Sequence, residues 1–381
     1  MPKSGWITTS IPNIYGQIAE PKGLTIGPDQ KIWAAVQTFD GTKGAISKVA
    51  MDQHVTSYPI SIVPDAIAFG SDQNLWVTSS NGVVARVTPA GVETDYAVAP
   101  RSAALASIIP GPDGRLWFIE CSSPTAGGIG AIATSGSSTL YATGCEQVLA
   151  VGSDGNIWFG DAATLANMTP QGVMIGQYAV GDNYFSGIAS GSDGALYVLG
   201  GFNSGSDELV RVQMDGTIGH IADDRVGDAL RGIASGPDGN LWISAVKGGS
   251  RHLITFDPAS QSFTSARIKA PAWGPNMVWG PDDNLWMLDR SRAGVYTYLR
   301  TAMTLSPRPI TVQVGHTANL NVTETNYSGQ WTAASKNQST ASVTANSNNG
   351  TFVVTGVAAG TTFVTVSDTM YNSASVKVSV H

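Results

Sequence analysis

Side chains suited to acid–base chemistry at neutral pH are few in this sequence, which has 5 histidines among 381 residues. A general base must lie within hydrogen-bond reach of the proton that it removes. His252, beside Lys247 and Arg251 in a predicted loop, is the one histidine that we expect to be able to reach a site. The other four lie in or near predicted outer strands or in the C-terminal region: His54, His220, His316 and His381.

Carboxylates flank several of the predicted strands and are the second source of chemistry: Glu20, Asp65, Glu120, Asp161 and Asp289. If the fold brings these strand ends to one rim, their oxygens could hold a metal ion. The alternative, which we favour, is that they are ordinary solvated loop carboxylates. The sequence lacks the Ser/His/Asp spacing, paired cysteines and phosphate-binding loop that would indicate another reaction.

The elements that must position these residues come from one repeat. A heptapeptide of the type Gly111-Pro-Asp-Gly-Arg-Leu-Trp117 occurs seven times, beginning at Gly27, Gly70, Gly111, Gly152, Gly191, Gly236 and Gly280. The spacings are 43, 41, 41, 39, 45 and 44 residues. A fixed period of roughly 40–50 residues with short strands is typical of propeller blades. The sequence therefore predicts an all-β fold, a seven-bladed β-propeller over residues 1–302.

Turn geometry and packing explain the residues of each repeat. Pro or Ser, then Asp, then Gly favours a tight turn between two apolar strands. In the following strand Leu and Trp point to opposite faces, and both are apolar because each blade packs between two others. We therefore interpret the tryptophans as blade-to-blade core. The seventh repeat lacks a fourth strand, and residues 6–12 are predicted to supply it, closing the ring and covering an open edge.

The two cysteines, Cys121 and Cys145, lie in loops that this topology places on one face. A disulfide between them would close a loop of about 25 residues and stabilise the fold by roughly 3 kcal/mol. The alternative is two free, half-buried thiols.

From Met303 onward the repeat stops and alternating Val, Thr and Ser segments begin, with a central tryptophan at Trp331. Short strands of this kind are typical of a small β-sandwich. The order of Val314-Gly-His-Thr-Ala-Asn-Leu320 and Gly350-Thr-Phe-Val-Val-Thr-Gly356 resembles the bacterial Ig-like domain family. The resemblance implies an Ig-like domain over residues 303–381 and exposure outside the cytoplasm.

The Gly-Pro-Asp-Gly-x-Leu-Trp repeat resembles that of the streptogramin (virginiamycin B) lyase family over nearly all of residues 6–300. This resemblance implies a seven-bladed propeller that opens a cyclic peptide antibiotic by Mg²⁺-assisted elimination. It also implies histidines and glutamates on the funnel face, five positions before each repeat glycine and just after the Leu-Trp strand. The shared residues are those that build blades, so the resemblance concerns the fold more than the activity.

Histidine is absent from those positions here. Five residues before the repeat glycines stand Lys22, Asp65, Ala106, Gln147, Ser186, Arg231 and Pro275. The remaining catalytic candidates are Asp289, Arg231 and His252. The residues expected to line a ligand-binding funnel face are Lys22, Asp65, Glu120, Gln147, Asp161, Arg231 and Asp289. We expect no cofactor, with Mg²⁺ needed only if the chain is a lyase.

The net charge and the composition exclude some classes of binding partner. A net charge of −7 argues against binding to nucleic acid, and no apolar run is long enough to span a membrane. The N-terminal residues do not resemble a signal peptide. We therefore expect either that a signal peptide has been removed or that the protein leaves the cell by another route, for instance on a virus particle.

Two functions follow. The first is a non-enzymatic module on a bacterial surface or a virion, which binds a protein or a glycan and can assemble through the Ig-like domain. The second is a Mg²⁺-dependent lyase acting on a cyclic peptide or a polysaccharide. The missing histidines and the adhesion-type tail favour the first, and the start without a signal peptide favours a virion.

Overall fold

The computed structural model describes residues 6–50, 52–123, 126–161, 163–181, 184–201, 207–221, 229–263, 268–269, 276–281, 284–289, 294–298, 303–324, 330–344, 346–347, 349–368 and 373–381. Every regular element in these ranges is a β-strand, which confirms the all-β prediction. None of the described segments forms a helix with the length and apolar character to cross a membrane. One compact unit spans Ile7–Tyr298, and the strands after residue 302 belong to a second. The predicted boundary at 302 and 303 adjoins residues 299–302, which lie outside the described part.

The first unit consists of seven antiparallel sheets, which we number as blades in chain order. Blade one contains β2 (Ala19–Ile26), β3 (Ile32–Thr38), β4 (Gly44–Val49) and β5 (Val55–Ile60); blade two β6 (Pro64–Phe69), β7 (Leu75–Ser79), β8 (Val83–Val87) and β9 (Glu93–Ala97); blade three β10 (Ala104–Pro110), β11 (Leu116–Ser123), β12 (Ala126–Ile132) and β13 (Ser138–Ala142); blade four β14 (Val148–Val151), β15 (Ile157–Asp161), β16 (Thr164–Met168) and β17 (Met174–Ala179). Blade five contains β18 (Tyr184–Ser190), β19 (Leu196–Gly201), β20 (Asp207–Val212) and β21 (Ile218–Ile221); blade six β22 (Ala229–Ser235), β23 (Leu241–Lys247) and β24 (Ser250–Asp257), with β25 (Ser262–Phe263) and β26 (Ile268–Lys269) both paired to β24; blade seven β27 (Met277–Trp279), β28 (Leu285–Asp289), β29 (Gly294–Tyr298) and β1 (Trp6–Ser10).

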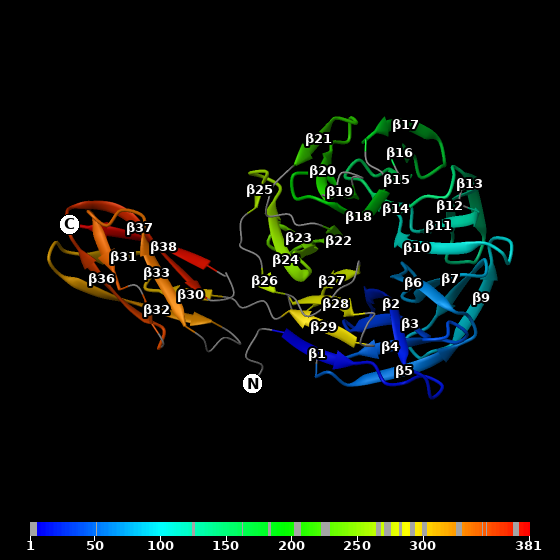
Figure 1. The fold of residues 1–381 in the computed structure, drawn as a ribbon, viewed down its shortest axis with the longest axis horizontal. Helices are drawn as coiled ribbons and strands as arrows, with labels where there is room; N and C mark the ends of the chain where they lie inside the picture. Colours follow the sequence, from blue (N-terminus) through cyan, green and yellow to red (C-terminus); the bar gives the residue numbers. More distant parts are fainter. Residues whose placement is uncertain are drawn as a thin grey trace. The chain divides into compact units, whose positions relative to one another are not determined.

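The blades form a closed ring. The first strand of each blade lies innermost and packs against the first strand of the next, so that β2, β6, β10, β14, β18, β22 and β27 surround a central channel (Figure 1). β1 takes the outer position of blade seven, next to β29. The N-terminal strand therefore closes the ring as predicted, although it ends at Ser10 rather than at residue 12.

The repeat aspartate holds the repeat tryptophan. Trp117 Nε1 donates a hydrogen bond of 3.1 Å to Asp113 Oδ1, and the same bond of 2.9–3.4 Å occurs in blades one, two, four and six. The indole also lies against the first glycine of the turn, where a Cβ on Gly111 would meet Trp117 Cδ1 at 2.3 Å. The repeat thus needs Gly, Asp and Trp together because they form one packed unit.

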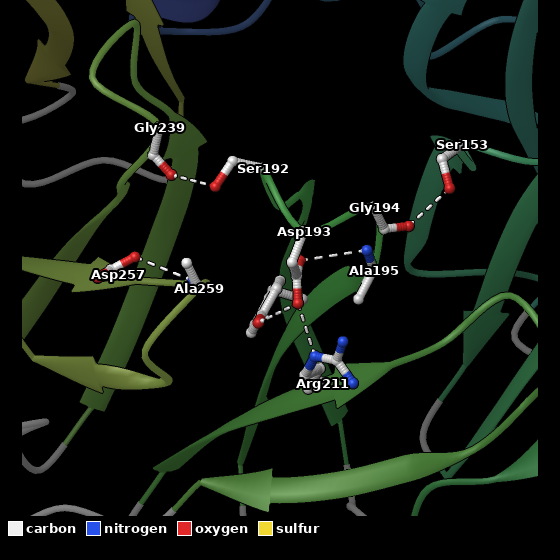
Figure 2. A network of polar contacts seen from close by, with 10 residues as sticks. Ser153, Ser192, Asp193, Gly194, Ala195, Arg211, Gly239, Asp257 and Ala259 are labelled. Atoms are coloured by element: carbon white, nitrogen blue, oxygen red, sulfur yellow. Dashed lines mark hydrogen bonds and ion pairs between the residues drawn. The ribbon is translucent and has the colours of Figure 1, made fainter.

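These units join neighbouring blades. Trp117 is fully buried among residues of blades three and four, which agrees with the interpretation of the tryptophans as core. It stacks on Tyr141 at 5.7 Å between ring centroids, and Tyr141 in turn covers Gly172 in the outer turn of blade four. Figure 2 shows a second link, in which Ser153 donates to the Gly194 carbonyl at 2.6 Å across the next junction. Contacts at the turns therefore join blade three to blade four and blade four to blade five.

In blade five a tyrosine replaces the tryptophan. Tyr197 Oη donates to Asp193 Oδ2 at 3.1 Å, and Arg211 Nε donates to the same carboxylate at 2.8 Å (Figure 2). Burial and the Asp193 charge raise the pKa of Tyr197 to about 12. The hydrogen bond between the repeat aspartate and the repeat aromatic residue is therefore present in blade five, although that aromatic residue is a tyrosine.

The second unit is a sandwich of two sheets. One contains β30 (Met303–Ser306), β32 (Thr317–Glu324), β36 (Thr351–Gly356) and β34 (Ala341–Val343); the other contains β31 (Ile310–Val312), β38 (Ser373–Val380), β37 (Gly360–Asp368), β33 (Trp331–Ser335) and β35 (Asn346–Ser347). Apolar side chains from both sheets form one core around Leu320, Phe352 and Val364. Trp331 packs on this core and donates to Glu324 Oε2 at 2.7 Å.

Candidate functional site

A cavity of about 490 Å³ lies in the channel of the propeller, lined by residues of all seven inner strands or of the chain entering them. We call it the channel cavity. Its polar lining consists of Lys22, Asp65, Ser107, Gln147, Ser186 and Asn276. Three residues predicted for the funnel face, Lys22, Asp65 and Gln147, are therefore brought together from blades one, two and four.

β-Bulges place several of these side chains. The pairing of the inner strand with its neighbour skips a residue or two in five blades, at Lys22, at Asp65 with Ala66, at Ser107, at Ser186 and at Arg231. An extra residue in one strand bends that strand and re-aims its side chain. In blades one, two, five and six the residue five positions before the repeat glycine therefore lies at a bulge. In blade three the bulge lies one residue later, at Ser107, which has a φ of 42°.

Polar side chains at these positions bond to the neighbouring blade. Gln147 Oε1 accepts from the Phe185 amide at 2.7 Å, which joins blades four and five. Ser186 Oγ donates to the Leu230 carbonyl at 3.0 Å, which joins blades five and six. The side-chain amide of Asn276 donates to the carbonyl oxygen of Lys22, which joins blades seven and one. Much of the polar lining of the channel cavity therefore holds the ring together.

The charged lining does not fit the magnesium ion that the family resemblance implies. Lys22 Nζ is paired with Glu20 Oε1 at 3.1 Å, and Gln37 Nε2 donates to the other oxygen of Glu20 at 3.0 Å. Asp65 is the one carboxylate among the described lining residues. Mg²⁺ binds through oxygen ligands, and an ammonium group in the same cavity would repel it. Among the described residues, no group of three or more His, Cys, Asp or Glu could hold a metal ion.

Arg231 occupies the bulge of blade six but belongs to a different cluster. Tyr184 Oη donates to Asp207 Oδ1 at 3.1 Å, and Asp207 Oδ2 accepts from the Leu230 amide at 2.5 Å. Burial and the Asp207 charge raise the pKa of Tyr184, whereas Arg231 lowers it. Arg231 is not among the described residues that line the channel cavity. A tyrosine that keeps its proton as a hydrogen-bond donor is a poor general base at neutral pH.

Three predicted site residues lie elsewhere. Glu120 is 1% exposed, accepts a hydrogen bond from Ser122 inside the sheet of blade three, and is not among the described residues that line the channel cavity. Asp161 lines a separate hollow between blades three and four. His252 lies on β24, the third strand from the channel, opposite Ala245. Asp289 ends β28, and its side chain lies outside the described part.

Sequence reasoning missed Ser107, Asn276 and the Tyr184–Asp207 pair. Ser107 and Asn276 each lie one residue after the position five before the repeat glycine. A search for polar residues on both sides of that position would have found them. The pair was not detectable, because Tyr184 and Asp207 come from different strands of blade five.

Cys121 and Cys145 form a disulfide, with 4.8 Å between their Cα atoms and 24 residues between them in sequence. Cys121 lies in β11, and Cys145 lies in the connection that leads to β14. The bond therefore fixes this connection, which includes Glu146, to the second strand of blade three.

Four-stranded blades around a channel with a bulged inner rim define the first unit as a β-propeller. The model of the virginiamycin B lyase family matches residues 8–221 and 60–295, and that of the bacterial Ig-like domain (group 2) matches residues 300–378. The chain belongs to the virginiamycin B lyase family and carries a bacterial Ig-like domain at its C-terminal end. No curated protein matches the sequence.

Solved structures give the same fold. A catalytically inactive virginiamycin B lyase from Staphylococcus aureus, solved with quinupristin, is 19% identical with a TM-score of 0.64, over 77% of this chain and 98% of that one. The extracellular domain of a putative hybrid two-component system from B. thetaiotaomicron is 12% identical with a TM-score of 0.61, over 99% of this chain and 57% of that one. YCF48 bound to D1 peptide is 14% identical with a TM-score of 0.58, over 81% and 99%. At these identities the likeness concerns the fold.

Proposed function

We propose that this chain is a non-enzymatic binding module, exposed outside the cell, which takes a protein segment or a glycan at the channel cavity. One observation carries the proposal: Gln147, Ser186 and Asn276 use their polar groups to join blades. What the cavity offers a ligand is a mixed polar surface with one ammonium and one carboxylate, from Lys22 and Asp65. Such a surface can orient a ligand by hydrogen bonds, but it offers no evident acid–base pair.

The proposed location is a cell surface. A disulfide is typical of an oxidising compartment, and the Ig-like domain belongs to a family whose members are often adhesive or spacing modules. One structure with the same fold is an extracellular domain of a two-component system. The virion alternative has no comparable support.

The lyase alternative rests on family membership. It requires a rearranged site, since none of the seven positions that precede the repeat glycines holds histidine. Arg231, near Tyr184 and Asp207, is the described group from which such a site would be built.

The binding function is tested with the full chain on arrays of surface glycans and of peptides from secreted proteins. We expect retention of a ligand in the presence of a chelator, and a loss of affinity of about tenfold in Lys22→Ala, because hydrogen bonds to charged groups contribute roughly 1.5–3 kcal/mol. Lys43→Ala is the matched control, since Lys43 is an exposed lysine of the same blade that does not line the cavity. Equal affinity of the two variants would contradict the channel as the binding site.

A further inference from the structure

A second hollow lies between blades three and four. Its volume is about 330 Å³, and its lining includes Thr143, Glu146, Asp161, Thr164, Met174 and Gln177. It has no lining residue in common with the channel cavity. We call it the acidic hollow, because its lining contains two carboxylates and no basic residue.

Glu146 is the unusual group of the acidic hollow. It is 8% exposed, and in the described part of the chain no cation pairs with it. A buried charge is costly unless it is paired, so the hollow favours a bound cation.

The electrostatics of the hollow agree with this. Burial raises the pKa of Glu146, the Thr143 hydroxyl opposes the rise, and the negative charge of Asp161 adds to it. A cation near both carboxylates would offset the repulsion between them and favour the ionised form of Glu146.

The rim of the hollow includes an exposed apolar side chain. Met174, which lines the hollow, is 45% exposed. Met174 begins β17, the outer strand of blade four, whose far edge is unpaired among the described strands. A long basic side chain has an aliphatic stem that can cover such a surface while its charged end reaches deeper.

We propose that the acidic hollow binds a lysine or arginine side chain of a partner protein, with its stem on Met174 and its charged end between Glu146 and Asp161. The site is separate from the channel cavity. A divalent metal ion is less suited to it, since Ca²⁺ takes six to eight oxygen ligands. The disulfide positions the site, because Cys145 precedes Glu146 directly.

The test uses the full chain labelled with ¹³C at its methionine methyl groups, with n-butylammonium chloride as the probe. Met174→Leu identifies the Met174 signal. We expect that signal to shift to saturation with butylammonium and not with 1-butanol. Glu146→Gln should weaken the binding about tenfold, because a charge-assisted contact is lost. Glu93→Gln is the matched control: Glu93 is a half-buried carboxylate that lies beside another, Asp95, and its pKa is also raised by burial.

Affinity should rise with pH through the raised pKa of Glu146, since the carboxyl must be ionised to hold the cation. Equal response to 1-butanol, unchanged affinity in Glu146→Gln, or saturation by calcium chloride without any response to butylammonium would each overturn the proposal. Asp161→Asn gives the same comparison if Glu146→Gln does not fold. Lys22→Ala should leave butylammonium binding unchanged, so failure here is distinguishable from failure of the channel proposal.

Discussion

Trp117→Ala is expected to lower the free energy of unfolding of the propeller by about 3–5 kcal/mol, the range for removal of a large buried aromatic side chain. Trp117 is fully buried between blades three and four. The substitution also removes the stack on Tyr141 and leaves Asp113 without its indole donor. Urea unfolding of the full chain, followed by circular dichroism, measures the change.

The matched control lies in the other unit. Trp331→Ala removes the buried tryptophan of the Ig-like domain, so it should shift the unfolding transition of that domain and leave the transition of the propeller in place. A loss below about 1 kcal/mol in Trp117→Ala would contradict the account of the repeat as a packed unit of Gly, Asp and Trp.

The double substitution Cys121→Ser with Cys145→Ser is expected to lower the stability of the propeller by roughly 3 kcal/mol, because the unfolded chain regains the freedom of the loop that the disulfide closes. That loop separates the cysteines by 24 residues. Unfolding of the wild-type chain with and without reductant checks the value, and the reduced wild type should match the double variant. Two alkylated thiols in the unreduced native protein would contradict the bond.

The fold was predictable because one physical unit recurs. A turn such as Gly111-Pro-Asp-Gly114 needs a left-handed fourth residue, and φ is 80° at Gly114. The same turn needs the Asp113 carboxylate for the Trp117 indole. Because so few residue types can form this turn and this hydrogen bond, the residues themselves predict the local structure. Their regular spacing along the chain then predicts the propeller.

The site was less predictable because bulges alter the alternation of side chains. Lys22 and Asp65 line the channel cavity at positions where the pairing of two strands is irregular. The residue types at these positions do not predict such irregularities. Glu120 differs from them: β11 stays regular through Glu120, which pairs with Leu105 and Gly128, so this residue stays in the sheet and not in a loop. Glu146 was overlooked because burial between blades cannot be inferred from its neighbours in sequence.

We propose that the channel cavity binds a ligand without the elimination chemistry of the family. The most direct measurement is incubation of the full chain with quinupristin and MgCl₂, followed by chromatography and fragmentation mass spectrometry. Elimination would break the ester C–O bond and leave a carboxylate and an alkene, so the product would have the mass of the substrate and a different retention time. We expect the antibiotic to remain cyclic with and without MgCl₂. An open-chain isomer that forms with the protein and MgCl₂, and that no longer forms when the metal is chelated, would show that the protein is a lyase.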